Sequence, residues 1–416
     1  MSIRVFLLAL TALLCLAASA VAKTPNVVMI ISDDQKWTDF GFMGHKTIQT
    51  PNLDRLARQS AVFPRGYVPS SLCRPSLATL ATGLYPHQHK ITGNDPPRGT
   101  NRALMLKHIA NVPTLPRLLA GKGYRSHQSG KWWEGNHRLG GFTHGMTHGD
   151  PKRRGRHGDE GLKIGRQGLK PIFDFIDEGG EKPFFLWYAP FLPHSPHNPP
   201  PRLLKKYRDK VDSPFVARYY AMCEWFDETC GQLLDHLDKR GLADDTLVVF
   251  VTDNGWIQKT NSGRYAPKSK RSPYDGGVRT PIMLRWPGKI KPAKLEVPVI
   301  STDLVPTILA ACDIRPSEQM QGINLLDVCG GKKPERKAIF GEIFGHDVID
   351  IDRPAANLLY RWCVEDRWKL ILPADGKGAE LYDILADPEE TKNLAGANAK
   401  VVTRLTQSIN VWWPAK

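Results

Sequence analysis

The chain has 416 residues, of which 41% are hydrophobic and 24% are charged. This composition is typical of a globular protein with a large buried core and excludes a disordered chain. The formal net charge of +15 favours an anionic ligand, but the sequence has no helix-turn-helix, zinc-finger spacing or aromatic RNA-binding motif, so we do not expect nucleic acid to be the partner.

Residues 1–22 are predicted to be a signal peptide. Arg4 precedes an apolar stretch from Val5 to Leu16, and small residues then continue to Ala22. The apolar stretch is short for a membrane span, so a membrane anchor is the less favoured interpretation. No later segment of the sequence is long and apolar enough to cross a bilayer. We therefore expect an exported protein, periplasmic or extracellular, without a stable membrane anchor.

Two apolar runs, at 26–31 and 246–252, end in polar residues that could bind a metal ion. Each run is long enough for a buried strand, and ligands of open α/β sheets bind at the carboxyl ends of the strands. Hard oxygen donors suit Ca²⁺, with Mg²⁺ as the less favoured ion. A lone Asp-Asn-Gly sequence is more often a turn, but two such strand ends favour a site. The four candidate metal ligands are Asp33, Asp34, Asp253 and Asn254.

Apolar runs alternate with helical patterns along the chain, which predicts an α/β fold with a mostly parallel central sheet flanked by helices. The expected strands are 26–31, 124–129, 183–189, 246–252 and 280–285. The expected helices are 52–60, 75–82, 113–121, 168–178 and 214–239. Cys223 and Cys230 lie two turns apart on the last helix, about 10 Å, which is too far for a disulfide. We expect both to be core residues.

The chain after residue 310 has a different pattern. Short alternating segments at 338–345, 358–364 and 367–372 predict a small antiparallel sheet, and a terminal helix is expected near 398–412. The predicted organisation is a signal peptide, a catalytic domain at 23–310 and a C-terminal α+β subdomain at 311–416.

The stretch from Cys73 to Gly83 reads Cys-Arg-Pro-Ser-Leu-Ala-Thr-Leu-Ala-Thr-Gly. It resembles the motif Cys-x-Pro-Ser-Arg-Ala-x-Leu-x-Thr-Gly of type I sulfatases, with Leu77 in place of the arginine. Alone, the stretch would also suit a helix start with a buried thiol. The resemblance implies the fold of the alkaline phosphatase superfamily. It also implies that a formylglycine-generating enzyme converts Cys73 to formylglycine.

Three more segments resemble sulfatase motifs. Gly130-Lys131-Trp132 is similar to Gly-Lys-Trp-His, with Trp133 in place of the histidine, and Pro193-His194-Ser195-Pro196 is similar to Pro-His-x-Pro. The stretch that begins at Lys270 resembles Lys-x-x-x-Tyr-Glu-Gly-Gly-x-Arg-x-Pro. The resemblance implies that Lys131 and Lys270 bind sulfate oxygens and that His194 binds the ester and protonates its leaving oxygen.

The implied reaction is hydrolysis of a sulfate ester by hydrated formylglycine at Cys73, which would also touch the Ca²⁺ ion. Leu77 and Trp133 replace two family residues near the formylglycine, so we expect another base there. His87, which directly follows the modified helix, is the tentative base, with His89 or a group on the substrate side as the alternatives.

Basic stretches at 152–157, continued by Lys163, Arg166 and Lys170, and at 259–271 could steer a polyanion, although each could also be a solvated loop. A sulfated carbohydrate is the favoured substrate. Two alternatives remain open: a phosphate or phosphonate ester hydrolase of the same superfamily, and a catalytically silent carbohydrate-binding relative.

Overall fold

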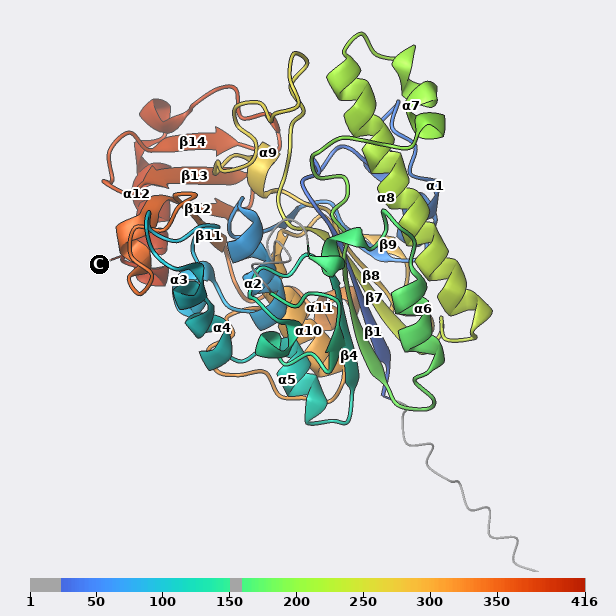
Figure 1. The fold of residues 1–416 in the computed structure, drawn as a ribbon. Helices are drawn as coiled ribbons and strands as arrows, with labels where there is room; N and C mark the ends of the chain where they lie inside the picture. The colour runs from blue at the N-terminus through green and yellow to red at the C-terminus, as the bar shows by residue number, and fades with distance from the viewer. Residues whose placement is uncertain (1–23, 150–158, 416) are drawn as a thin grey trace, which may run out of the picture.

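The computed structural model describes residues 24–149 and 159–415 (Figure 1). The expected signal peptide at 1–22 and the basic segment at 152–157 lie outside the described residues. A central sheet of eight strands has the order β5-β4-β6-β1-β7-β8-β2-β9. Its strands are β5 (His144–Gly145), β4 (Arg125–Gly130), β6 (Phe184–Ala189), β1 (Asn26–Ser32), β7 (Thr246–Thr252), β8 (Ile282–Arg285), β2 (Ala61–Phe63) and β9 (Ala293–Lys294).

The sheet is mostly parallel, as the sequence predicts. Strands β5, β4, β6, β1 and β7 pair in parallel, and only β8 runs against its two neighbours, β7 and β2. The carboxyl ends of β4, β6, β1 and β7 therefore meet at one edge of the sheet, where ligands bind in such folds.

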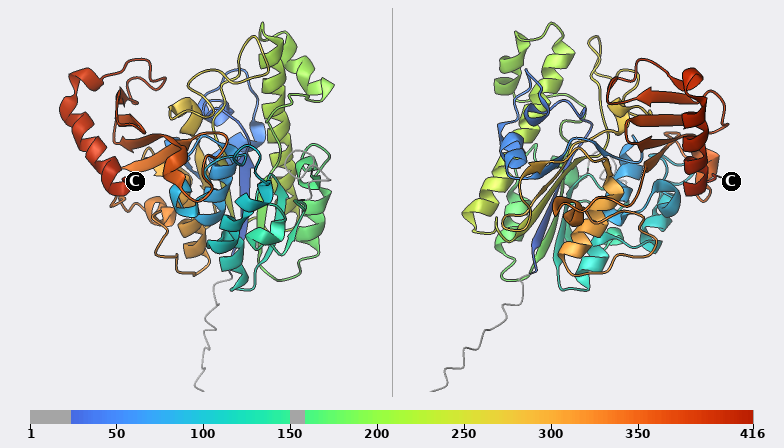
Figure 2. Two further views of the ribbon diagram at one scale, coloured as in Figure 1. Left: turned by 60° about the vertical axis from the view of Figure 1, so that its left-hand side comes forward. Right: turned by 180° about the vertical axis from the view of Figure 1, so that it is seen from behind.

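Helices cover both faces of the sheet (Figures 1 and 2). Side chains of β1 alternate between the faces, so Val27, Met29 and Ile31 join one apolar cluster, while Val28 and Ile30 join another. The first cluster includes residues of α2 (Cys73–Thr82), α5 (Leu115–Ala120), α10 (Leu304–Ala311) and α11 (Leu325–Cys329). The second includes residues of α1 (Pro51–Arg58), α6 (Lys170–Asp177) and α8 (Pro214–Lys239).

Four further α-helices complete the large unit in the described part of the chain. Helix α7 packs against α8, and the others lie in connections between the larger elements. They are α3 (Pro86–His89), α4 (Lys107–Asn111), α7 (Pro201–Arg208) and α9 (Asp275–Val278). A parallel pair of short strands, β3 (Gly66–Tyr67) with β10 (Val299–Ile300), lies outside the central sheet.

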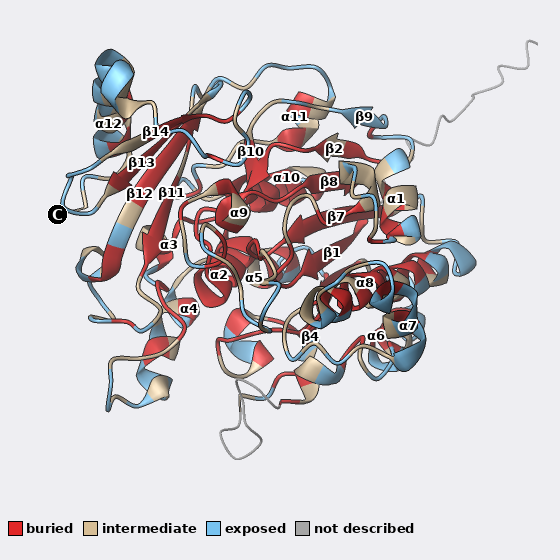
Figure 3. Cartoon of the chain, turned by 90° about the horizontal axis from the view of Figure 1, so that it is seen from above, coloured by how far each residue is buried: buried red, intermediate tan, exposed pale blue. Residues whose placement is uncertain are grey.

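The C-terminal part of the chain forms a second, antiparallel sheet of four strands. Its strands are β11 (Ile339–Phe344), β12 (Leu358–Glu365), β13 (Trp368–Pro373) and β14 (Glu380–Asp383). Helix α12 (Ala399–Trp412) packs Leu405 and Ile409 into an apolar cluster with Leu370 and Leu381 of this sheet. Figure 3 shows that burial is concentrated in the strands and in α2, whereas α12 presents exposed turns.

The predicted fold class is confirmed: a large α/β unit is joined to a small α+β unit with an antiparallel sheet. Helix α8 has the predicted bounds, and Cys223 and Cys230 are fully buried in it. Strands β2 and β9 were not predicted because three and two residues are too few to establish a period. The boundary expected at residue 310 falls in the last turn of α10, and the division into 23–310 and 311–416 stays a proposal. In the described part of the chain, no helix is long and apolar enough to span a membrane.

Candidate active site

The four predicted metal ligands meet at the carboxyl ends of β1 and β7. These strands pair in register, with Ser32 beside Thr252, so the residues that follow them are neighbours. The backbone amide of Asp34 donates to Oδ1 of Asp253 at 3.0 Å, and Nδ2 of Asn254 donates to Oδ1 of Asp34 at 2.6 Å. All four candidate ligands, Asp33 included, are buried.

Both predicted sulfate-binding lysines reach this cluster. Lys131, which follows β4, donates from Nζ to Oδ1 of Asp33 at 2.6 Å. Nζ of Lys270 lies 2.6 Å from Oδ1 of Asp34 and 3.0 Å from Sγ of Cys73. Burial alone would lower the pKa of each lysine, but the carboxylates, Asp33 for Lys131 and Asp34 for Lys270, outweigh burial and raise it. Both amino groups are therefore charged in the pH range where proteins are stable.

Cys73 is the first residue of α2, and only 1% of its surface is exposed. Burial raises the pKa of its thiol to about 11, although Lys131 and Lys270 act in the opposite direction. A thiol with this pKa is protonated at neutral pH and is a poor nucleophile. The unmodified side chain is thus poorly suited to attack an ester, even though it lies at the centre of the cluster.

His194 approaches the cluster from the segment after β6. This segment continues beside β1, since the amide of Asp33 donates to the carbonyl of Leu192 at 3.0 Å. Nδ1 of His194 donates to the carbonyl of Ser195 at 2.5 Å, so Nε2 faces Asp34, with 3.3 Å to Oδ2. Burial lowers the pKa of His194 well below its ordinary value, while the Asp34 carboxylate opposes that effect.

Arg166 fixes the segment that carries His194. Its Nη2 donates to the carbonyl of His194 and its Nε to the carbonyl of Phe191, both at 2.9 Å, and Nη1 donates to Oδ1 of Asn198 at 2.5 Å. The ring of Phe191 in turn stacks on the His194 ring, with 4.2 Å between the centroids. The imidazole is therefore held from the backbone side and from one ring face.

The donor set fits a hard cation. Oδ2 of Asp33 and Oδ1 of Asn254 are buried and accept no hydrogen bond from the part of the chain that the structure describes. One ligand atom from each of Asp33, Asp34, Cys73 and His194 lies within 4.8 Å of the others. Buried oxygen atoms that lack donors are groups that a cation would satisfy, and carboxylate and amide oxygens are the ligands of Ca²⁺.

The structure does not bring His87 or His89 into this cluster. Nδ1 of His87 lies 2.9 Å from Oε2 of Glu342, and its ring stacks on Trp413 at 4.6 Å. Nε2 of His89 lies 3.2 Å from Oγ1 of Thr79, which is six residues, or about 9 Å of helix, after Cys73. The tentative assignment of His87 as the base is therefore not supported, because its ring is held between Glu342 and Trp413.

The two departures from the sulfatase motifs are buried on the same face of the sheet. Leu77 and Trp133 belong to one apolar cluster, with 2% and 6% of their surfaces exposed. Nζ of Lys131 lies 5.2 Å from the centroid of the Trp133 ring. Hydrophobic packing thus occupies the side of the site where the family motifs place an arginine and a histidine.

Sequence reasoning missed several residues of the site. Phe191 and Trp256 follow β6 and β7, and Nζ of Lys270 lies 5.8 Å from the Trp256 ring. The signal in the sequence that could have found them is their position just after predicted strands. Arg166 lies in a basic stretch that we interpreted as a steering loop, and nothing in the sequence distinguishes it from the exposed lysines nearby.

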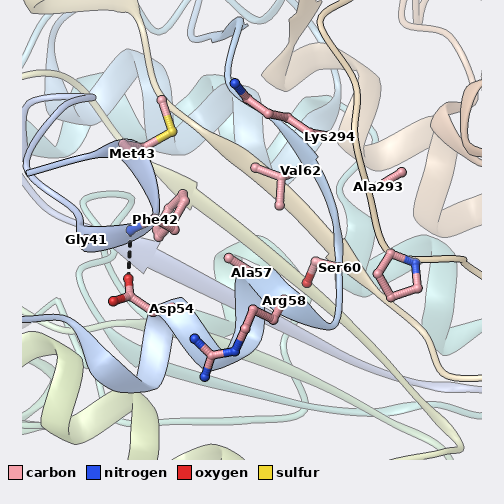
Figure 4. Close-up of a pocket in the computed structure, with 11 residues that line it drawn as sticks. Gly41, Phe42, Met43, Asp54, Ala57, Arg58, Ser60, Val62, Ala293 and Lys294 are labelled. Carbon is pink, nitrogen blue, oxygen red and sulfur yellow. Dashed lines mark hydrogen bonds between the residues drawn. The ribbon is translucent and has the colours of Figure 1, made fainter.

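A separate pocket of about 440 Å³ lies at the β9 edge of the sheet, beside α1 (Figure 4). Its lining is Gly41, Phe42, Met43, Asp54, Ala57, Arg58, Ser60, Val62, Pro292, Ala293 and Lys294. None of these residues belongs to the candidate site, so the two features are distinct.

Comparison with known proteins identifies the family. Residues 25–314 match the sulfatase family model, and residues 263–412 match the model for the C-terminal part of N-sulphoglucosamine sulphohydrolase. Human N-acetylgalactosamine-6-sulfatase is 30% identical, over 75% of this chain and 67% of its own length. The ulvan-active sulfatase of Formosa agariphila is 26% identical, over 89% of this chain and 77% of its own length.

A solved structure has the same fold. The protein BT4656, in complex with its substrate D-glucosamine-2-N,6-O-disulfate, superimposes with a TM-score of 0.78 at 21% identity, covering 94% of this chain and 98% of that one. The family match spans most of the chain and includes all four predicted motifs. The chain therefore belongs to the sulfatase family, the type I sulfatases of the alkaline phosphatase superfamily, and is a sulfuric ester hydrolase.

Proposed function

We propose that the protein hydrolyses sulfate esters of sulfated carbohydrates, with a formylglycine made from Cys73 and a bound Ca²⁺ ion. The single observation that carries this proposal is the convergence of Cys73, Lys131, His194 and Lys270 on the Asp33-Asp34 carboxylates at one buried point. This set supplies a nucleophile position, two cations for an anionic group and an acid for the leaving oxygen.

The substrate class is inferred from relatives and from charge. Two relatives are a sulfatase active on ulvan and an N-acetylgalactosamine-6-sulfatase, and BT4656 binds a disulfated glucosamine. The net charge of +15 also favours a polyanion. Which sugar and which sulfate position are used depends on the loops that surround the buried cluster.

Formylglycine in its hydrated form would supply one hydroxyl to attack sulfur and a second through which the sulfate can leave, and Ca²⁺ would stabilise the anionic form of the first. Asp33, Asp34, Asp253, Asn254 and the side chain at position 73 would hold the ion. Lys131 and Lys270 are charged, and both lie within hydrogen-bonding distance of the carboxylates beside Cys73. These contacts support the proposal that both lysines bind the oxygens of a sulfate group there.

His194 is assigned as the general acid. Because its Nδ1 is held by the carbonyl of Ser195, a second proton would reside on Nε2, which faces the cluster. The Asp34 carboxylate favours that charged form but does not outweigh burial, so the pKa of His194 lies well below its ordinary value and the second proton would be taken up together with the anionic ester. The proton on Nε2 can then pass to the alcohol oxygen as the ester bond breaks, which is the step that a sugar leaving group needs.

The proposal includes the path of the protein to its site of action. Residues 1–22 would direct export and be removed, and a formylglycine-generating enzyme would modify Cys73. The catalytic unit would be residues 23–310, with 311–416 as a C-terminal subdomain that contributes no group to the cluster described above.

The test is sulfate release from a panel of sulfated saccharides, with phosphate and phosphonate monoesters of the same alcohols as competitors. The wild type, Cys73→Ala and the control Cys363→Ala are each produced together with a formylglycine-generating enzyme. Cys363 is a suitable control because its thiol is buried in β12. We expect release from at least one sulfated saccharide, lost only in Cys73→Ala. Faster turnover of a phosphate or phosphonate ester would favour the alternative hydrolase, and saccharide binding without turnover would favour the silent relative.

A further inference from the structure

A buried ion pair joins the start of α2 to the segment that carries Lys131. Arg74 directly follows Cys73, and its Nε and Nη2 donate to the two carboxylate oxygens of Glu134 at 2.6 and 2.7 Å. Only 2% of the Arg74 side chain and 3% of the Glu134 side chain are exposed. Glu134 lies three residues after Lys131, so the pair spans the two segments that meet at the candidate site.

The remaining donors of Arg74 are also used. Nη1 donates to the carbonyl of Gly93 at 3.1 Å, and Nη2 donates to the carbonyl of Met105 at 2.9 Å. The backbone amide of Arg74 donates to Oδ1 of Asn94 at 3.0 Å. Arg74 thus ties together the first turn of α2, the loop at Gly93, the 3-10 helix Arg102–Leu106 and the Lys131 segment.

A buried ion pair of this kind adds little to the free energy of unfolding. Removing two charges from water carries a penalty that their attraction only partly offsets, and an apolar pair of similar volume often serves as well. A cation in the first turn of a helix is also disfavoured by the helix dipole. A fully hydrogen-bonded fork in this place is better explained by the geometry that it imposes.

The surroundings show why such a constraint is needed. Residues 131–134 have no regular secondary structure, so side-chain contacts fix their path. Arg74 is the only charged residue in α2, since Leu77 stands where the family motif has its arginine. The guanidinium of this helix is therefore directed to Glu134 instead of the reacting centre.

We propose that the Arg74–Glu134 pair is a positioning device that sets the distance between the side chain of Cys73 and the amino group of Lys131. Neither residue contacts the substrate; both act through the residues beside them. The role in turnover rests on the proposed function, whereas the effect on the packing of Cys73 does not.

The first test uses protein made without a formylglycine-generating enzyme, so that Cys73 stays a thiol. Iodoacetamide labelling of each cysteine is followed by peptide mass spectrometry in the wild type, in Glu134→Gln and in Arg74→Met/Glu134→Leu. Glu224→Gln is the matched control, because Glu224 is a buried carboxylate paired with Lys206 between α7 and α8. Cys230 and Cys363, both fully buried, serve as internal references.

We expect labelling of Cys73 to rise about tenfold or more in both pair variants, while Cys230 and Cys363 change less than about twofold, because a local opening exposes only nearby groups. The control should leave all three rates unchanged. An increase shared by all three cysteines would mean a merely structural pair, and an unchanged Cys73 rate would also overturn the proposal.

The second test uses the formylglycine form. The apolar double variant should melt close to the wild type, yet kcat for a sulfate ester should fall about 10²-fold with KM within about threefold, since small displacements of catalytic groups cost that much. A kcat within twofold of the wild type in a folded double variant contradicts the positioning role. If the wild type itself releases no sulfate, the proposed function fails, and the labelling test still decides on the pair.

Discussion

The amino group of Lys131 lies 5.2 Å from the centroid of the Trp133 ring, and both side chains are buried away from solvent. The lysine also donates to Asp33. An aromatic face attracts a desolvated cation by about 2 kcal/mol. Trp133, which replaces the histidine of the family motif, thus has a specific part in holding Lys131, the lysine that we propose binds sulfate.

Replacing Trp133 should separate packing from this interaction. Trp133→Ala should lower the free energy of unfolding by about 3–5 kcal/mol because it leaves a cavity in the apolar cluster. Trp133→Phe keeps a ring beside Lys131 and should retain more of both stability and turnover. Urea unfolding and sulfate-release kinetics check the two effects. Equal losses in both variants would contradict the role given to the ring.

Removing a carboxylate that we propose as a Ca²⁺ ligand should lower the amount of bound calcium. Asp253→Asn should weaken Ca²⁺ binding at least about tenfold, because affinity depends on the charge of the oxygen ligands. Bound calcium is measured by elemental analysis after dialysis. Asp227→Asn is the control, since that buried carboxylate caps the start of α1 and takes no part in the cluster. Equal calcium content in the two variants would disprove the assigned ligands.

The thiol of unmodified Cys73 should titrate at high pH. Burial raises its pKa from 9.0 to about 11, so the reactive thiolate is scarce at neutral pH. In protein that has been treated with a chelator to remove metal, the rate of Cys73 alkylation should rise about tenfold per pH unit from pH 7 to pH 10 without a plateau. An unfolded peptide with the same sequence should level off near pH 9. A plateau at that pH in the folded protein would show that the thiol is not shielded.

Much of the site could be predicted because strand ends and motifs are local in the sequence. The runs before Asp33 and Asp253 are long and apolar, and parallel pairing then places their ends together. The contacts of His87 with Glu342 and Trp413 give its assignment as the base no support, because proximity in the chain says nothing about where a side chain points. The contact of Arg74 with Glu134 crosses 60 residues, and no periodic pattern predicts it.

Substitutions of Arg166 and of His194 should lower the hydrolysis rate in a way that depends similarly on the leaving group of the ester. His194→Ala should slow hydrolysis of a saccharide sulfate about 10²–10⁴-fold, and an aryl sulfate much less, because a phenolate leaves without a proton. Arg166→Lys loses the fork that holds the His194 segment and should show a smaller loss with the same preference. Arg202→Lys, in an exposed pair with Glu228, is the control. An equal loss on both substrates would rule out the acid role.

The mass of the peptide that contains Cys73 tests the central claim most directly, because the proposed nucleophile requires the modification despite Leu77. Protein from a host with a formylglycine-generating enzyme should carry a peptide about 18 Da lighter than the thiol form, since sulfur and two hydrogens are replaced by oxygen. The lighter fraction should rise in proportion to the turnover rate across preparations. A fully active preparation in which this peptide retains the unmodified thiol would contradict the account.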